Sequence, residues 1–238
     1  MTATSRFAWF TLLACLAIPA LADNNDYVYI RSNVNQPWGQ GTNESAMDTV
    51  FGTDNWSLLF YETVPGNSLF SSSTKFIFME GGDSSYAAFE SYMQINGDAA
   101  YTWLRNGGRM LIMAAPNDPL SGANLYLPDN IVLHSDAYYA SAASSAYAID
   151  VSNPIFSSPS PTAYVFSGDF YSHGYYTGDN VVSMMKSNLN QIVLGRDVIG
   201  AGIMVFGGQT TDNFHLPQPA AHNLLENIIY YTAATNLN

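Results

Sequence analysis

Cysteine is almost absent from this sequence, which has 238 residues and a single cysteine, Cys15. Cys15 lies in an apolar N-terminal segment that we expect to be removed on export, which would leave a chain without thiols. Such a chain can form neither a disulfide framework nor a thiolate metal site. A cysteine nucleophile is excluded for the same reason, and the stability must come from packing.

Basic residues are also scarce, with seven Lys and Arg against 19 Asp and Glu. Loss of Arg6 with the N-terminal segment leaves six basic residues and a net charge of −13. A field of this sign repels phosphate backbones, and the remaining basic residues are scattered along the sequence. Nucleic acid is therefore not an expected partner.

Only the N-terminal segment has the pattern of an export signal. Arg6 precedes an apolar stretch, Pro19 follows it, and Ala20-Leu21-Ala22 matches the pattern of small residues that a signal peptidase accepts. The stretch is shorter than the roughly 20 apolar residues of a membrane span. We expect a signal peptide over residues 1–22, and a secreted, extracellular or periplasmic protein that begins at Asp23. The alternative is a lipoprotein, because residues 12–15 loosely resemble a lipobox that would leave Cys15 acylated.

Residues 23–238 have the length of a single domain with one sizeable core. Apolar runs predict strands, and 3.6-residue periodicity predicts helices. The predicted strands are residues 26–32, 57–63, 75–82, 109–116 and 130–135, with two more in residues 190–208 joined through residues 198–202. The predicted helices are residues 44–51, 84–106, 180–189 and 219–234, with a break expected at Asn96-Gly97 and a stop at Gly107-Gly108.

Several of these strands are apolar on both faces, and helices separate them. This combination is typical of a parallel sheet that is covered on both sides. The right-handed crossover rule then favours an α/β, doubly wound, mostly parallel central sheet with helices on both faces, which is a flavodoxin-like arrangement. The prolines of residues 150–166 exclude a long helix there, so strands and loops are expected.

Three segments carry a resemblance to a known family: FIFMEGGD, NGGRMLIMAAP and GAGIMVFGGQTTDNFHLPQPAAHNLLENIIYYTAA. Their order resembles the class I glutamine amidotransferase-like superfold, in particular a secreted bacterial form of its ThuA-like (trehalose-utilisation-like) branch. The positions that match are Gly200, Gly202, Gly207, Gly208, Phe214, Pro217, Leu224, Leu225 and Tyr231.

The departures from that family bear on chemistry. Its catalytic members place a cysteine on a sharp turn after a strand, whereas here the corresponding strand ends Met113-Ala114-Ala115-Pro116. Pro116 also lacks the N–H that an oxyanion hole would use, and no Gly-x-Ser-x-Gly motif is present. Gln209 stands where ThuA-like chains often have histidine. We therefore expect no glutaminase activity and assign no catalytic residue or cofactor.

Polar side chains follow the predicted strands at the sheet edge where α/β proteins bind ligands. Carboxylates with one or two histidines could bind a hard cation or act as an acid–base pair, so a metal is left open. The alternative is structural: Glu80 would cap backbone N–H groups, His215 and His222 would bond loop and helix ends, and Asp212-Asn213 would form a turn. The candidate ligand-binding residues are Glu80, Asp83, Gln209, Asp212, His215, Asp169 and His173, with Asn117 and Asp118 nearby.

Three functions remain open. The favoured one is a secreted or surface-associated, non-catalytic module with a binding or scaffolding role, whose partners would be carbohydrate or cell-surface components. The second is a secreted carbohydrate-related enzyme that uses Glu80 and Asp83 with His215 or His173. The third is a self-associating extracellular protein, favoured by low charge density and 16 tyrosines. Fold alone does not decide among them.

Overall fold

The computed structural model describes residues 26–117, 124–135 and 143–235. The predicted signal peptide, the lipobox and Asp118 lie outside these residues. Within them, no helix has the length and apolar character needed to cross a membrane.

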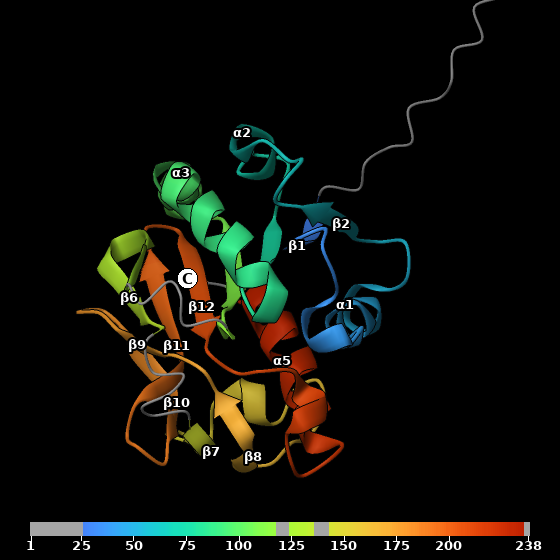
Figure 1. Cartoon of the computed structure of the whole chain (residues 1–238), viewed down its shortest axis with the longest axis vertical. Coiled ribbons are helices and arrows are strands. Elements are labelled where there is room, and N and C mark those ends of the chain that lie inside the picture. Colours follow the sequence, from blue (N-terminus) through green and yellow to red (C-terminus); the bar gives the residue numbers. More distant parts are fainter. Residues whose placement is uncertain (1–25, 118–123, 136–142, 236–238) are drawn as a thin grey trace, which may run out of the picture.

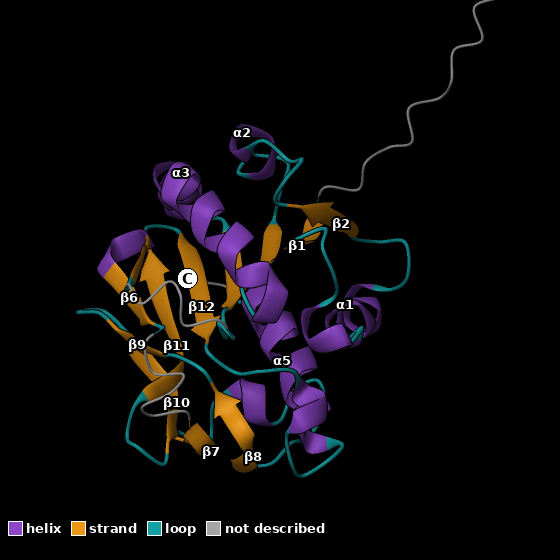
Figure 2. Ribbon diagram, viewed as in Figure 1, coloured by secondary structure: helices purple, strands orange, loops and turns teal. Residues whose placement is uncertain are grey.

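The described residues form a mixed sheet of 12 strands (Figures 1 and 2). One half is parallel and has the order β2-β1-β3-β4-β12. These strands span Ser57–Phe60 (β2), Tyr27–Arg31 (β1), Phe76–Glu80 (β3), Arg109–Met113 (β4) and Gly202–Gly207 (β12). The prediction that residues 76–79, 110–114 and 203–206 run parallel in one sheet is confirmed.

The other half continues from β12 through antiparallel pairs in the order β11-β10-β7-β8. These strands span Ile192–Ile199 (β11), Val182–Ser187 (β10), Ala143–Ala148 (β7) and Val165–Ser172 (β8). A branch of short strands, β5 (Leu125–Leu127), β6 (Ile131–His134) and β9 (Tyr175–Thr177), joins at β11. The α/β class and the mostly parallel core are therefore confirmed, whereas the complete sheet is mixed.

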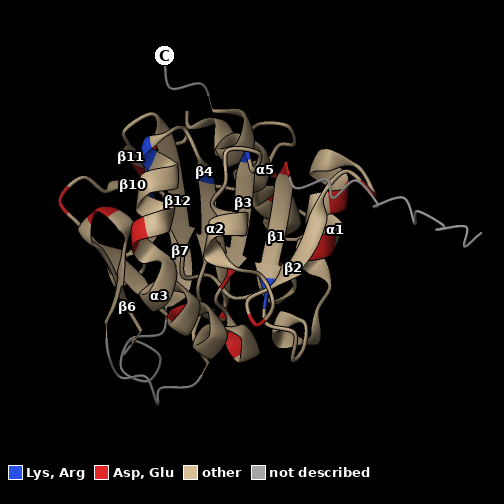
Figure 3. Cartoon of the chain, turned by 90° about the horizontal axis from the view of Figure 1, so that it is seen from above, with Lys and Arg blue, Asp and Glu red and all other residues tan. Residues whose placement is uncertain are grey.

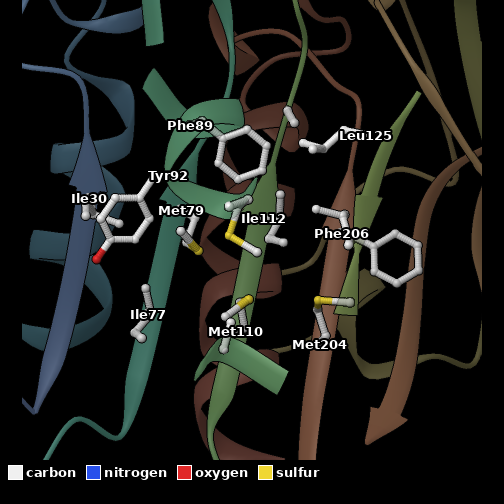
Figure 4. Close-up of a cluster of buried hydrophobic side chains, with 14 of the residues drawn as sticks. Ile30, Ile77, Met79, Phe89, Tyr92, Met110, Ile112, Leu125, Met204 and Phe206 are labelled. Atoms are coloured by element: carbon white, nitrogen blue, oxygen red, sulfur yellow. The ribbon is translucent and has the colours of Figure 1, made fainter. Parts of the chain in front are cut away.

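Alternate residues of the parallel strands belong to two separate apolar clusters, as the two-residue period of a strand requires. In the first cluster Met79, Ile112 and Phe206 pack with Phe89 and Tyr92 of helix α3 (Tyr86–Arg105) (Figure 4). The second contains the remaining strand residues, with helix α1 (Thr42–Phe51) and helix α5 (Ala220–Ala234). The strands carry no polar face because both faces are buried.

Helix α3 runs through Asn96 and Gly97 without the expected break. Nothing lies within 4 Å of a Cβ placed on Gly97, and Asn96 donates a 3.0 Å hydrogen bond to the Tyr92 carbonyl. The expected stop is confirmed, because Gly107 adopts φ +103° and donates to the Leu104 carbonyl at 2.9 Å.

The prediction of a helix over residues 180–189 is wrong, because most of this segment is strand β10. Its apolar residues fit a helical stripe, but Met184 and Met185 are buried within the sheet, where β10 pairs with β7 and β11. A short amphipathic segment has too little intrinsic helix stability to resist such pairing.

The remaining short elements connect these layers. Helix α2 spans Gly66–Leu69, and the 3-10 turns are η1 (Pro37–Gly39), η2 (Asp83–Ser85), η4 (Pro128–Asn130), η5 (Pro154–Phe156) and η6 (Asp212–Phe214). Acidic residues outnumber the few Lys and Arg residues, as Figure 3 shows. The turns η1 and η6 lie at the carboxyl ends of the parallel strands and help to build the site described below.

Candidate functional site

A small cavity lies at the carboxyl ends of β3, β4 and β12. Parallel strands bring these ends together at one edge of the sheet, and α1, β8 and α5 supply the other walls. The volume of about 40 Å³ has room for a few water molecules. The lining residues are Pro37, Trp38, Gln40, Thr42, Asn43, Glu80, Met113, Tyr171, Gln209, Thr210, Thr211, Asp212, His215, Ala221, Leu224, Leu225 and Ile228.

Glu80 ends β3 and is buried in the cavity wall. Its two carboxyl oxygens accept 2.5 Å hydrogen bonds, one from the Gly82 N–H and one from Asn43 Nδ2. Burial nevertheless raises the pKa of Glu80 to about 8, since these two hydrogen bonds offset only part of the desolvation. Glu80 is therefore mainly a neutral acid at pH 7, and it also caps a backbone N–H group as the structural alternative expected.

Gln209 follows β12 and is 6% exposed. Neither its amide nitrogen nor its amide oxygen has a hydrogen-bond partner among the described residues. Gln209 lies close to the Tyr171 hydroxyl. Burial raises the pKa of Tyr171, and the interaction with Gln209 offsets part of this rise. A buried amide without well-formed hydrogen bonds costs free energy, so this side chain needs an explanation.

Asp212 lies in η6 and contacts helix α5 through His222. The His222 Nδ1–H donates to Asp212 Oδ2 at 2.7 Å, and His222 Nε2 lies 3.1 Å from Glu226 Oε1. Burial acts to raise the pKa of Asp212, but the hydrogen bonds from His222 and Thr42 outweigh it and lower the pKa. The hydrogen bond to Asp212 raises the pKa of His222. The pair is thus an internally compensated ion pair.

His215 is buried beside the cavity, where it forms a 2.9 Å hydrogen bond with Thr210 Oγ1. Its ring lies 4.2 Å from the ring of Tyr171. Burial lowers the pKa of His215 to about 4, although the charge of Asp212 opposes the shift. His215 is therefore a neutral imidazole near pH 7.

The structure brings four of the seven predicted residues, Glu80, Gln209, Asp212 and His215, to one cavity. The other three do not line it. Asp83 accepts hydrogen bonds from the Trp38 N–H at 3.0 Å and from Asn117 at 3.1 Å. His173 is bonded to the Pro116 carbonyl at 3.0 Å and packs edge-on against Trp38. Asp169 is exposed on β8 and does not line the cavity.

The prediction missed Trp38, Thr42 and Asn43, which follow β1. The strand-end rule that selected Glu80 applies equally to β1 and would have found them. Asn43 bonds Glu80, and Thr42 lies 2.9 Å from the Thr211 hydroxyl. Trp38 adopts φ +57°, which is uncommon for a bulky residue, and Asp83 holds its backbone N–H.

The described wall of the cavity contains no cysteine or serine that could serve as a nucleophile. Its threonines are hydrogen-bonded, Thr42 to Thr211 and Thr210 to the Phe170 carbonyl and to the neutral imidazole of His215. Across the described residues, no group of three or more His, Cys, Asp or Glu side chains could hold a metal ion. The cavity is suited to hydrogen bonding with a small polar group.

Comparisons with known proteins bear on the fold. No protein-family model and no curated protein matches the chain. A putative GMP synthase component from Thermoplasma acidophilum is similar in structure, with a TM-score of 0.55 and 8% identity over 87% of this chain and 94% of that one. This likeness shows an α/β fold and is compatible with a glutamine amidotransferase-like fold.

Two further structures have lower scores. An exo-beta-1,4-mannosidase from Opitutaceae bacterium strain TAV5 has a TM-score of 0.48 and 13% identity over 88% of this chain and 36% of that one. A cytoplasmic protein from Salmonella typhimurium has a TM-score of 0.49 and 12% identity over 87% and 98%. The chain therefore spans about a third of the mannosidase.

Proposed function

We propose that this chain is a non-catalytic binding module that holds a small, neutral, hydrogen-bonding group in the cavity beside Trp38. One observation carries the proposal: the Gln209 amide is buried in the cavity wall and forms no well-aligned hydrogen bond with the described residues, the Tyr171 hydroxyl being its one near polar neighbour. A ligand that both donates and accepts hydrogen bonds would remove this cost.

The charges around the cavity favour a neutral ligand. Glu80 is mainly protonated and His215 is neutral near pH 7, while Asp212 is compensated by His222. The lining residues include no Lys or Arg to neutralise an anion. A hydroxyl group of a carbohydrate has the required donor and acceptor, and the small volume implies that only such a group enters while the rest of the molecule stays outside.

The scaffold that we propose for this module is the doubly wound, ThuA-like form of the amidotransferase-like fold. The parallel half-sheet and the two apolar clusters, one with α3 and the other with α1 and α5, support it. We further propose that the protein is exported, on the basis of the sequence pattern around Ala22. Mass spectrometry of the protein from its native host should find Asp23 as the first residue, whereas an acylated Cys15 would support the lipoprotein alternative.

Isothermal titration calorimetry tests the binding proposal. The full chain is titrated with neutral saccharides, sugar acids and amino sugars. We expect binding by a neutral saccharide and its loss in Gln209→Leu. Gln94→Leu is the matched control, because Gln94 is exposed on α3. Binding that is restricted to anionic ligands, or that survives in Gln209→Leu, would contradict the proposal.

A second candidate is hydrolysis of a glycoside, in which Glu80 would act as the acid. The observation that favours this activity is that one cavity contains two carboxyl groups whose pKa values shift in opposite directions. Burial raises the pKa of Glu80, and hydrogen bonds lower the pKa of Asp212. A panel of glycosides and glutamine distinguishes the candidates. Turnover abolished in Glu80→Gln would support the enzyme, and no turnover is expected if the protein only binds.

A further inference from the structure

Four aromatic rings from separate segments form a continuous row beside the cavity. Trp38 of η1 lines the cavity, and its ring centre lies 6.1 Å from that of Phe214 in η6 and 5.2 Å from that of His173, which follows β8. Phe170 of β8 extends the row, with its ring centre 5.8 Å from that of His173. Neighbouring rings in the row meet edge to face. We call Trp38, Phe170, His173 and Phe214 the aromatic row.

Much of the aromatic row is in contact with water. Phe214 is 45% exposed and Phe170 is 54% exposed, and Trp38 is half-buried. Exposed aromatic side chains that gather beside a cavity are typical of a surface that a ligand covers, since water contacts them at a cost in free energy.

Two members of the aromatic row have unusual backbone conformations. Trp38 and Phe170 both adopt φ +57°, in the left-handed region that bulky residues rarely occupy. Asp83, at φ +46°, accepts a 3.0 Å hydrogen bond from the Trp38 N–H and helps to hold that conformation. Such conformations cost free energy and concentrate at functional sites. The fold therefore keeps both rings beside the cavity in spite of this cost.

Polar groups lie directly below the aromatic row. Trp38 Nε1 and Glu80 Oε1 are 3.3 and 2.7 Å from the point that a Cβ on Gly82 would occupy, so the polar edge of the indole is directed at the end of β3. The buried Gln209 amide, which forms no well-aligned hydrogen bond with the described residues, lines the same cavity. A ligand that fits this arrangement has a flat apolar face and a polar group at its edge.

We infer that the aromatic row is a stacking subsite for the pyranose ring of a neutral saccharide, one hydroxyl of which enters the cavity. This inference rests on the proposed function and adds the ring as the element that is recognised. One face of a pyranose presents C–H bonds, whose partly positive hydrogens pack against the negative face of an aromatic ring, and its rim carries the hydroxyl groups. An open-chain polyol has similar hydroxyls but no such face. The subsite therefore selects the ring over the open chain.

Isothermal titration calorimetry of the full chain tests this selectivity. The probes are the methyl glycosides of glucose, galactose and mannose, each compared with its open-chain alditol. At least one pyranoside should bind about threefold to tenfold more tightly than its alditol, which is the contribution expected from stacking on an aromatic ring.

Phe214 is the residue to change, because its exposure makes a folding defect least expected. Phe214→Leu removes the aromatic face and keeps an apolar side chain, so it should abolish most of the preference for the ring. Phe214→Tyr keeps the aromatic face and should keep the preference. Tyr126→Leu is the matched control, because Tyr126 is a 71% exposed aromatic residue of β5 that does not line the cavity, and it should leave the preference unchanged.

Tryptophan fluorescence gives a second readout that a general loss of structure does not reproduce. A pyranoside should change the emission of the wild type, because it covers Trp38. Trp38→Phe should still bind the pyranoside in the calorimeter but lose this change. The other described tryptophans do not line the cavity: Trp56 donates to Asp48, and Trp103 donates to the Ser71 carbonyl.

The possible failures of the two proposals are distinguishable. Equal binding of pyranoside and alditol that Phe214→Leu leaves unchanged and Gln209→Leu abolishes would overturn the stacking subsite and leave the proposed function intact. No binding by any neutral sugar would overturn both. Preferential binding of choline chloride that Phe214→Leu abolishes would also overturn the subsite, because the row would then recognise a cation.

Discussion

Asp212 and His222 form a 2.7 Å hydrogen bond that joins the cavity wall to helix α5. Burial acts to raise the pKa of Asp212, and the hydrogen bonds from His222 and Thr42 reverse that effect and lower it, while the pKa of His222 is raised. Glu226 lies on the other side of the imidazole, 3.1 Å from Nε2. Both ring nitrogens therefore face carboxylates, which stabilises the imidazolium form.

This ion pair should make the free energy of unfolding depend on pH in two ranges, one set by the pKa of His222 and the other by the pKa of Asp212. Because the pKa of His222 is raised, its contribution is complete below the ordinary value of 6.5 and is lost as the pH rises through the higher folded-state value. Because the pKa of Asp212 is lowered, its contribution is present above 3.8 and is lost as the pH falls through the lower folded-state value.

His222→Ala should therefore lower the free energy of unfolding by roughly 1–3 kcal/mol between these limits, because it leaves Asp212 buried without its partner. Urea unfolding over a series of pH values measures the effect. The variant should also lose most of the decline in stability above pH 6.5. His134→Ala, which removes a histidine bonded to Thr177, should keep that decline. An unchanged pH profile in His222→Ala would contradict the ion pair.

Glu80→Gln should change the pH dependence of the free energy of unfolding, in a range different from that of the Asp212–His222 pair. Burial holds the pKa of Glu80 at about 8, so wild-type stability should fall as the pH rises from 4.5 towards 8, where the unfolded chain ionises before the folded one does. Glutamine cannot ionise, and rotation of the Asn43 amide would let Asn43 Oδ1 accept from the new side chain. The difference in unfolding free energy between variant and wild type should grow over this range and then level off. A constant difference would show that Glu80 ionises normally.

Two glycines give a matched pair of alanine substitutions. A Cβ on Gly202 would clash with the Leu104 carbonyl oxygen, so Gly202→Ala should force the β11–β12 turn away from the end of α3. We expect a loss of roughly 1–3 kcal/mol. Gly97→Ala lies within α3 with open space around it and should stabilise the protein by about 0.5–1 kcal/mol. Urea unfolding compares the two, and equal effects would contradict the packing described here.

Leu225→Ala tests whether α5 packs as the structure describes. Leu225 is 7% exposed, lines the cavity and belongs to the second apolar cluster, so its truncation should cost about 2–5 kcal/mol. Tyr230→Ala, at a position 44% exposed on the same helix, should change stability by roughly 0.5 kcal/mol or less. Thermal unfolding measures both changes. Similar small losses would show that α5 is not held against the sheet.

The buried parallel strands were predictable from local sequence. Residues 76–79, 110–114 and 203–206 are apolar at consecutive positions, which is typical of a strand in a sheet that is buried on both sides. The stop after α3 was also predictable, since Gly107 and Gly108 follow directly. Asn96-Gly97 was misread because a glycine inside a helix costs only about 1 kcal/mol, and the packing of Phe89 and Trp103 exceeds this.

The strand-end rule placed Glu80, Gln209, Asp212 and His215 near one another, because the residues after parallel strands meet at one edge. The rule does not predict which of these side chains form hydrogen bonds with other parts of the protein. Asp83 and His173 bond to the backbone of Trp38 and Pro116, and this depends on how the loops fold over the edge.

Composition and local pattern determined the apolar strands, the helix stop and the edge at which polar residues gather, because each depends on neighbours in the chain. Tertiary structure alone decided that residues 182–187 are a strand, since their apolar stripe fits either form and the sheet supplied hydrogen bonds. Tertiary structure also decided the protonation of Glu80 and left the buried Gln209 amide without a well-formed hydrogen bond. Both depend on burial by segments distant in sequence, which removes water and leaves only the partners that the fold provides.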